Sequence, residues 1–258
     1  MGQDTEWRDS DHGIYLLFAK GTRPDRDAVA RFVGSQLATS ITFDPKSVRT
    51  PQVAGGDRAW VELLRDGLLF DLEGLAPSQP LSVPMTEHRF DFDHSKSFAM
   101  YDAIRLIPGA HLGGGEHTLP VVRCLISLAR DLAYEFEDIA AFVWPPASSV
   151  ISREFFESTC TAWLAGGAFP ALGLTSFRET MDGALQSVGL EYLIGQELRI
   201  EPPLSSDRVE ATRLGIRLIN QLILVGGIEK SERLAAPDGT RLIMRLSRNE
   251  KFVRVSRE

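Results

Sequence analysis

The sequence predicts an α+β protein in which helices pack on an antiparallel or mixed sheet. Its 258 residues are 43% hydrophobic and 24% charged, which is the composition of an ordinary globular protein. Short apolar runs of strand length alternate with longer segments whose apolar residues recur at helical spacing. The order strand, helix, hairpin occurs twice. The chain is therefore expected to form one compact unit or two ferredoxin-like (split βαβ) halves.

The first half is expected over residues 13–86, after a flexible N-terminus of residues 1–12. Residues 13–19 are a continuous apolar run, which predicts a central strand. A helix is expected over residues 24–38, because Pro24 is tolerated in a first turn and apolar residues then recur on one side.

The next segment predicts a hairpin between two loops. Residues 44–57 are rich in proline and glycine and are expected as a loop. Two apolar runs then flank Asp66-Gly67, a pair that suits the positive φ angles of a tight hairpin turn. Residues 74–86 contain three prolines and are expected as an exposed linker.

The second half is expected over residues 87–258. It is expected to begin with a strand at residues 103–107, an amphipathic helix at 118–136, a strand at 139–144 and a capped helix at 152–165. A hairpin at 171–190, an alternating strand at 198–201, a long helix that ends at 225 and terminal strands at 242–255 follow. Ser152 is of a residue type that caps helices, and either Ser206 or Asp207 is expected to begin the last long helix.

Charge separates the C-terminal segment from the rest of the chain. Residues 241–258 contain six Lys/Arg and two Glu, a net charge of +4; since the whole chain carries −7, the other 240 residues carry −11. We expect these basic residues on the solvated face of a strand. Nucleic acid is not an expected partner, because an acidic chain repels phosphates and Phe252 is the only aromatic residue in the segment.

The two cysteines, Cys124 and Cys160, lie on two different expected helices. They have no CxxC or Cys/His metal spacing, so buried free thiols in a reducing compartment are expected. The N-terminal residues lack the apolar stretch of a signal peptide, and no run approaches the roughly 18 apolar residues of a membrane span. We therefore expect a cytoplasmic protein with no membrane partner.

Four of the five histidines lie between residues 88 and 117. Residues 88–94 read His-Arg-Phe-Asp-Phe-Asp-His, which is rich in metal-ligand types. In a strand, however, the histidines share one face with the phenylalanines, and the aspartates share the other with Arg89. Imidazoles and carboxylates then cannot converge, so we expect a surface strand with Arg89 near its two aspartates and no metal site.

A glycine-rich loop before the helix at residue 118 is the candidate binding site. Backbone N–H groups at a helix N-terminus can hold an anion, although this spacing is neither G-x-G-x-x-G nor a P-loop. A tight connection that needs positive φ angles is the other interpretation, and both stay open. The residues of such a small-ligand cleft would be His111, Gly113, Gly114, Gly115, Glu116 and His117.

No catalytic residue is assigned. The chain has no G-x-S-x-G motif, and the serines Ser148 and Ser149 follow a strand end, where capping is the ordinary role. The carboxylate of Asp131 is expected on the solvated side of its helix. Trp144 and Trp163 are expected in the core.

The chain also resembles a known family between residues 105 and 225. Four features occur in order. A Gly-rich turn precedes a helix at residues 113–120, and a strand ends in aromatic-Pro at 140–147. A short apolar strand ends in Phe-Arg at 171–178, and a Gly-Leu-Glu turn leads into an alternating strand at 189–202. This stretch resembles the bacterial family known as domain of unknown function 4261. The resemblance implies an α+β fold in a bacterial cytosolic protein and carries no established activity; the basic C-terminal segment has no counterpart in it.

Because no acid/base, metal or nucleophile set converges in the sequence, the expected function is that of a non-enzymatic interaction or regulatory protein without a cofactor. The alternative is a small-molecule-binding protein or an enzyme that uses a cleft near residues 111–117. A protein partner is expected. A homodimer is a further expectation, formed if an edge strand such as residues 241–247 pairs with a second copy.

Overall fold

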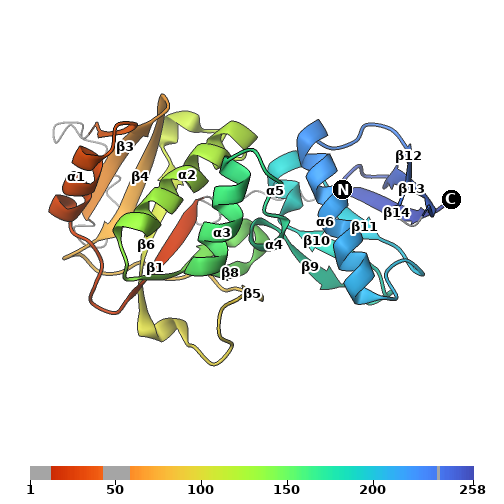
Figure 1. Ribbon diagram of the computed structural model, residues 1–258, viewed down its shortest axis with the longest axis horizontal. Helices are drawn as coiled ribbons and strands as arrows, with labels where there is room; N and C mark the ends of the chain where they lie inside the picture. The colour runs from red at the N-terminus through yellow and green to blue at the C-terminus, as the bar shows by residue number, and fades with distance from the viewer. Residues whose placement is uncertain (1–12, 43–58, 237–238) are drawn as a thin grey trace.

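The computed structural model describes residues 13–42, 59–236 and 239–258. In this part of the chain the strands form two mixed sheets, of eight and six strands, in two lobes that lie side by side (Figure 1). Helices pack on both sheets, so the predicted α+β class is confirmed. The expected flexible N-terminus at 1–12 and the expected loop at 44–57 lie outside the described residues.

The larger sheet takes strands from both sides of the boundary that was expected after residue 86. Its strands follow the order β2 (Thr39–Ile41), β3 (Ala59–Arg65), β4 (Leu68–Leu75), β6 (Tyr101–Pro108), β1 (Ile14–Ala19), β7 (Ile139–Trp144), β8 (Ser149–Ser152) and β5 (His88–Phe90). β1 is antiparallel to both β6 and β7. α2 (Leu119–Glu135) joins β6 to β7 across β1, which is the split βαβ arrangement.

The smaller sheet is built from residues that follow position 175. Its strands follow the order β12 (Glu232–Ala235), β13 (Arg241–Leu246), β14 (Phe252–Arg257), β11 (Glu197–Ile200), β10 (Leu185–Val188) and β9 (Ser176–Glu179). All neighbours are antiparallel except β11 and β14, which are parallel. Its order does not repeat that of the larger sheet, so only the larger sheet contains a split βαβ unit among the described residues.

Local signals place most of these elements where the sequence predicts them. Asp66 and Gly67 have φ angles of 51° and 78°, which form the tight turn between β3 and β4. α3 (Arg153–Leu164) begins after Ser152, whose hydroxyl accepts a hydrogen bond from the N–H of Phe155 at 3.1 Å. α1 (Arg26–Ser35) ends three residues before the predicted Ala38.

The last long helix, α6 (Arg208–Val225), begins after Asp207, one of the two expected caps. The Asp207 carboxylate accepts hydrogen bonds from the N–H groups of Val209 at 3.0 Å and Glu210 at 3.1 Å. Gly226, at a φ of 77°, ends the helix. α6 then lies against β10 and β11 and covers one face of the smaller sheet (Figure 1).

The larger sheet is covered on both faces. α2 and α3 pack on one face over the main core (Figure 1). On the other face, a second apolar cluster that includes Tyr15 and Leu17 is covered by Leu81, Val83 and Phe98. Residues 74–86 are thus not a fully exposed linker, because two of their side chains pack on the sheet.

The two lobes join where β7 ends. Trp144, the last residue of β7, is fully buried, and its indole N–H donates a hydrogen bond to the carbonyl of Leu174 at 3.0 Å. Its ring meets the ring of Tyr192 edge to face at 5.6 Å. Tyr192 belongs to α5 (Leu190–Ile194), so this contact ties the smaller lobe to the larger one.

A glycine and a buried carboxylate shape the same junction. Gly189 has a φ of +91°, and a Cβ at this position would lie 2.8 Å from the carbonyl oxygen of Pro146. The Glu197 carboxylate accepts hydrogen bonds from the N–H groups of Gly189 at 2.8 Å and Glu191 at 3.1 Å. Burial raises the pKa of Glu197. Glu197 therefore caps α5 from a neighbouring strand, in place of a local side chain.

The strand expected to offer a dimer edge is not at an edge. β13 lies between β12 and β14, so residues 241–244 pair on both sides and have no free edge for a second copy, and β12 is the outer strand there. None of the helices formed by the described residues combines the length and apolar character that crossing a bilayer requires.

Candidate functional site

Arginines from four strands form one row across the smaller sheet. Arg245 in β13 lies opposite Arg254 in β14, which lies opposite Arg199 in β11. Arg199 lies opposite Gln186 in β10, and Gln186 lies opposite Arg178 in β9. Residues paired in register project to the same face of a sheet, so the four guanidinium groups share one face. We call Arg178, Arg199, Arg245 and Arg254 the arginine row.

The core determines which face carries the row. Leu198, Val253 and Val255 are fully buried and alternate along β11 and β14 with the arginine positions. Because successive side chains of a strand point to opposite faces, burying these residues in the main core directs Arg199 and Arg254 to the other face. A slip of one residue would bury the arginines, so the register is strongly determined.

A hollow of about 250 Å³ opens beside the centre of the row. It is lined by Arg199, Arg254, Phe252 and Ser247, and carbon atoms make most of its wall. Ser247 is held by β14, because its hydroxyl oxygen accepts a hydrogen bond from the N–H of Phe252 at 3.0 Å. The hollow therefore combines two cationic groups with an aromatic ring.

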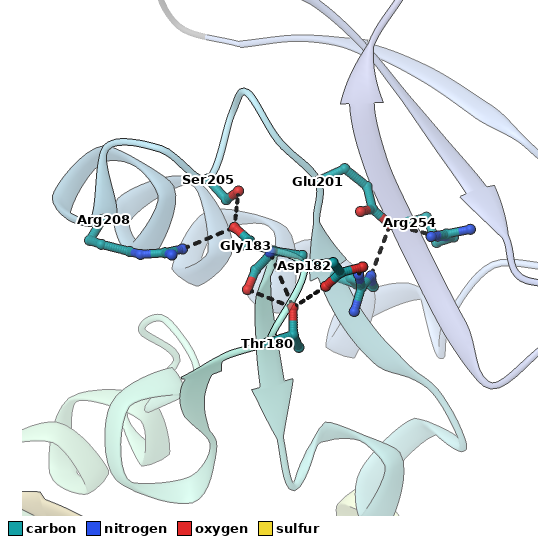
Figure 2. A network of polar contacts seen from close by, with 9 residues as sticks. Thr180, Asp182, Gly183, Glu201, Ser205, Arg208 and Arg254 are labelled. Atoms are coloured by element: carbon teal, nitrogen blue, oxygen red, sulfur yellow. Dashed lines mark hydrogen bonds and ion pairs between the residues drawn. The ribbon is translucent and has the colours of Figure 1, made fainter.

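Two carboxylates of the chain already bind the central arginines. Glu201 Oε1 accepts hydrogen bonds from Arg199 Nε at 2.9 Å and from Arg254 Nε at 2.6 Å. Asp182, in the turn between β9 and β10, forms an ion pair with Arg199 from the other side. Figure 2 shows this network, in which Arg254 reaches Glu201 and Thr180 reaches Asp182.

The turn that carries Asp182 is itself held in place. The Thr180 hydroxyl donates a hydrogen bond to Asp182 at 2.6 Å, and the Ser205 hydroxyl donates one to the carbonyl of Gly183 at 2.7 Å (Figure 2). The Thr180 hydrogen bond, together with Arg199, lowers the pKa of Asp182 to about 2. Asp182 is thus ionised at neutral pH, and its side chain is 65% exposed to solvent.

The two ends of the row differ from its centre. Arg245 and Arg178 are exposed, and within the described part of the chain neither has a hydrogen-bond or ion-pair partner. The row therefore has four guanidinium groups against two nearby carboxylates, and its ends are open to solvent.

The loop predicted as a ligand cleft forms an exposed connection between β6 and α2. His111 lies beside Gly109, and Glu116 reaches toward Gly113. The ring of His117 meets Tyr192 edge to face at 6.3 Å. Glu116 also lies close enough to Tyr192 to raise the pKa of that residue, after the larger effect of burial, so Glu116 and His117 share this neighbour while His111 lies beside Gly109. The hollow described above lies on the other lobe. Ligand binding at His111, Gly113, Gly114, Gly115, Glu116 and His117 stays a prediction.

Gly114 is the loop residue with a positive φ, at 83°. This agrees with the interpretation of the loop as a tight connection. The expected cap of α2, Thr118, gives no side-chain hydrogen bond to the helix and instead donates to the carbonyl of Gly115 at 2.7 Å.

The segment at 88–94 is a strand only over its first three residues. β5 ends at Phe90 because Asp91 adopts a φ of 51°, which breaks the alternation expected up to His94. Arg89 donates hydrogen bonds to the carbonyls of Asp93 and Lys96 rather than to the two aspartate side chains. Across the described residues, no group of three or more His, Cys, Asp or Glu is placed to hold a metal ion.

The candidate nucleophiles are engaged in the fold. The Ser149 hydroxyl is buried and donates to the carbonyl of Gly173 at 2.6 Å. Both cysteines are unpaired and buried, as expected. Burial raises the pKa of Cys124 to about 11 and that of Cys160 to about 12. These thiols are therefore poor nucleophiles at neutral pH.

One predicted surface carboxylate is mostly covered by other side chains. Asp131 was expected in solvent, but its side chain is 12% exposed and forms ion pairs with Arg65 and, at 2.8 Å, with Arg130. The helix pattern indicated the face of Asp131 but not the arginine that reaches it from β3.

The sequence indicated part of the arginine row. Arg245 and Arg254 belong to the basic C-terminal segment, and their alternation in expected strands indicated an exposed face. Arg199 and Arg178 precede that segment by more than 40 residues, and only the pairing of β11 with β14 brings them beside it. Comparisons with protein-family models, with curated proteins and with solved structures gave no match for this chain.

Proposed function

We propose that this chain is a non-enzymatic interaction protein of the cytoplasm that binds a protein partner through the arginine row. One observation carries the proposal: Arg245, Arg254 and Arg199 face one another directly across adjacent strands. Like charges placed opposite each other across strands are destabilising. A face without a binding role would favour alternating charges, so a partner that supplies the missing negative charge explains the arrangement.

The state of the other reactive groups supports a binding role over a catalytic one. The buried serine donates to a backbone carbonyl, and burial raises the pKa of both thiols. The histidines of the glycine-rich loop have no shared neighbour that could form a reacting centre. General acid–base and nucleophilic mechanisms need such groups within hydrogen-bond reach of each other.

Site-specific photocross-linking tests the proposal. Arg248, exposed and next to the hollow residue Ser247, is replaced by p-benzoylphenylalanine, and Arg31, exposed on α1 of the other lobe, receives the same replacement as a control. Both proteins are irradiated in lysate of the source cells. We expect a discrete adduct at 248 only, suppressed by excess wild-type protein but not by excess protein with Arg245→Glu and Arg254→Glu. Identical adducts at both positions, or adducts that wild-type protein does not suppress, would contradict the proposal.

A further inference from the structure

The internal carboxylates indicate which anion the arginine row accepts. Glu201 bridges Arg199 and Arg254, and Asp182 takes a further position on Arg199. The guanidinium forks are thus already oriented for carboxylate oxygens, a geometry that arginine recognises well. From this we propose that the row is the docking surface for an extended acidic segment of a partner polypeptide. The proposal rests on the proposed function and specifies the chemistry of the partner.

The dimensions of the row match an extended segment. From Arg245 to Arg178 there are four inter-strand steps, and neighbouring strands lie about 4.8 Å apart, so the row spans about 19 Å. An extended chain rises about 3.3 Å per residue, so about six residues cover this length. In such a segment, alternate side chains lie about 6.6 Å apart on one face, and three or four acidic residues would therefore face the arginines.

The hollow favours a side chain with an aliphatic part. Phe252 lines it together with the two bridged arginines, and most of its wall is carbon. A glutamate can place its methylene groups against this ring while its carboxylate reaches Arg199 or Arg254. The phosphate of a nucleotide has no apolar part to place there, and base stacking would need further aromatic residues on the face.

The overall charge also favours an acidic peptide over nucleic acid. The chain carries −7, so a long polyanion that reaches beyond the row meets net repulsion. A short segment with three or four carboxylates contacts the row alone. Its binding is electrostatic and exposed, so it should weaken as the salt concentration rises.

Asp182 competes with the incoming segment. Its side chain is 65% exposed and holds one side of Arg199, whose own side chain is only 13% exposed. Removing the Asp182 charge would free that side of Arg199 for a partner carboxylate. The structure therefore predicts that loss of an acidic residue strengthens binding, beyond what the change in net charge alone gives.

Fluorescence anisotropy at low salt tests the proposal with a defined probe, a labelled octapeptide of alternating serine and glutamate. We expect saturable binding to the full chain. Arg245→Glu combined with Arg254→Glu should weaken it at least about tenfold. The matched control, Arg31→Glu combined with Arg26→Glu on α1, makes the same change in net charge away from the row and should leave affinity within about twofold. Circular dichroism verifies that each variant is folded.

The second pair of variants tests the competition. Asp182→Asn should tighten binding about 1.5- to 5-fold, the range of an exposed ion pair. Asp138→Asn, at an exposed position before β7, gives the same change in charge and should tighten it less. No saturable binding, equal weakening by both double variants, or tighter binding of a single-stranded oligonucleotide of equal charge would overturn the inference. If the cross-link at 248 persists in that case, the interaction role stands and only the partner chemistry is wrong.

Discussion

Replacing Gly189 by alanine tests the close approach that joins the two lobes. Gly189 precedes α5 at a φ of +91°, and Gly195 ends the same helix at a φ of +74°. A Cβ at Gly189 would lie 2.8 Å from the carbonyl oxygen of Pro146 and 2.9 Å from backbone atoms of Ala147, whereas a Cβ at Gly195 has nothing within 4 Å. The two substitutions therefore share the backbone strain and differ in the contact.

The expected magnitudes follow from these two contributions. An alanine in the left-handed region costs about 1–2 kcal/mol at either glycine. Forcing a methyl group against backbone that packs closely adds about 1–3 kcal/mol, which applies at Gly189 only. We expect Gly195→Ala to lower the free energy of unfolding by about 1–2 kcal/mol and Gly189→Ala by about 2–5 kcal/mol. The lower entropy of the unfolded alanine chains affects both variants alike.

Urea unfolding followed by tryptophan fluorescence measures the difference, because Trp144 lies at the same junction and reports its opening. The slopes of free energy against urea concentration should match among the three proteins, so that the midpoints compare stability. If the two variants differ by less than about 0.5 kcal/mol, the contact with Pro146 and Ala147 is absent and this account of the junction is wrong.

Two further predictions concern titration. Burial, together with the nearby charges of Glu62 and Glu73, raises the pKa of Asp71 to about 6. The folded state therefore binds this proton more tightly than the unfolded state, and the free energy of unfolding of the wild type falls as the pH rises from about 4 to about 6. The free energy of unfolding of Asp71→Asn should thus exceed that of wild type at pH 8 by on the order of 1 kcal/mol after solvent screening, and this difference should vanish near pH 4. Urea midpoints at the two pH values measure the difference, and a difference independent of pH would contradict the prediction. Burial raises the pKa of Cys124 to about 11 and that of Cys160 to about 12. Both thiols should therefore react with Ellman's reagent at pH 8 far more slowly in the folded protein than in urea. A thiol that reacts rapidly in the folded protein would refute their burial.

Signals that act within about four residues were predicted well. The tight turn at Asp66-Gly67 and the cap at Ser152 follow from local backbone chemistry, and the structure places both as expected. For the last long helix the sequence left Ser206 and Asp207 open, and the structure selects Asp207. The periodicity of α2 also identifies its buried face, because nine of its residues are buried. Such features depend on neighbours in the sequence, so no tertiary information is needed to find them.

Features that depend on partners far along the chain were not predictable. Asp131 was expected in solvent because its helix position is polar, yet Arg65 reaches it from a strand 66 residues earlier. In the segment at 88–94, alternation predicted a strand up to His94, but the positive φ of Asp91 ends it. Pattern gives the face on which a side chain lies, and tertiary packing decides what that face meets.

The same reasoning separates the arginine row from ordinary surface charge. The alternation of Arg254 with Val253 and Val255 follows from the core, and many residue types would satisfy an exposed position there. Core packing explains why position 254 faces out, but it does not explain why arginine also stands opposite it at 245 and at 199. Two carboxylates, Glu201 and Asp182, offset the central pair, and within the described part of the chain the arginines at the ends of the row form no ion pair. A partner that brings carboxylates would supply the charge that these exposed guanidinium groups lack within the fold, and this is the reason for proposing the row as a binding surface.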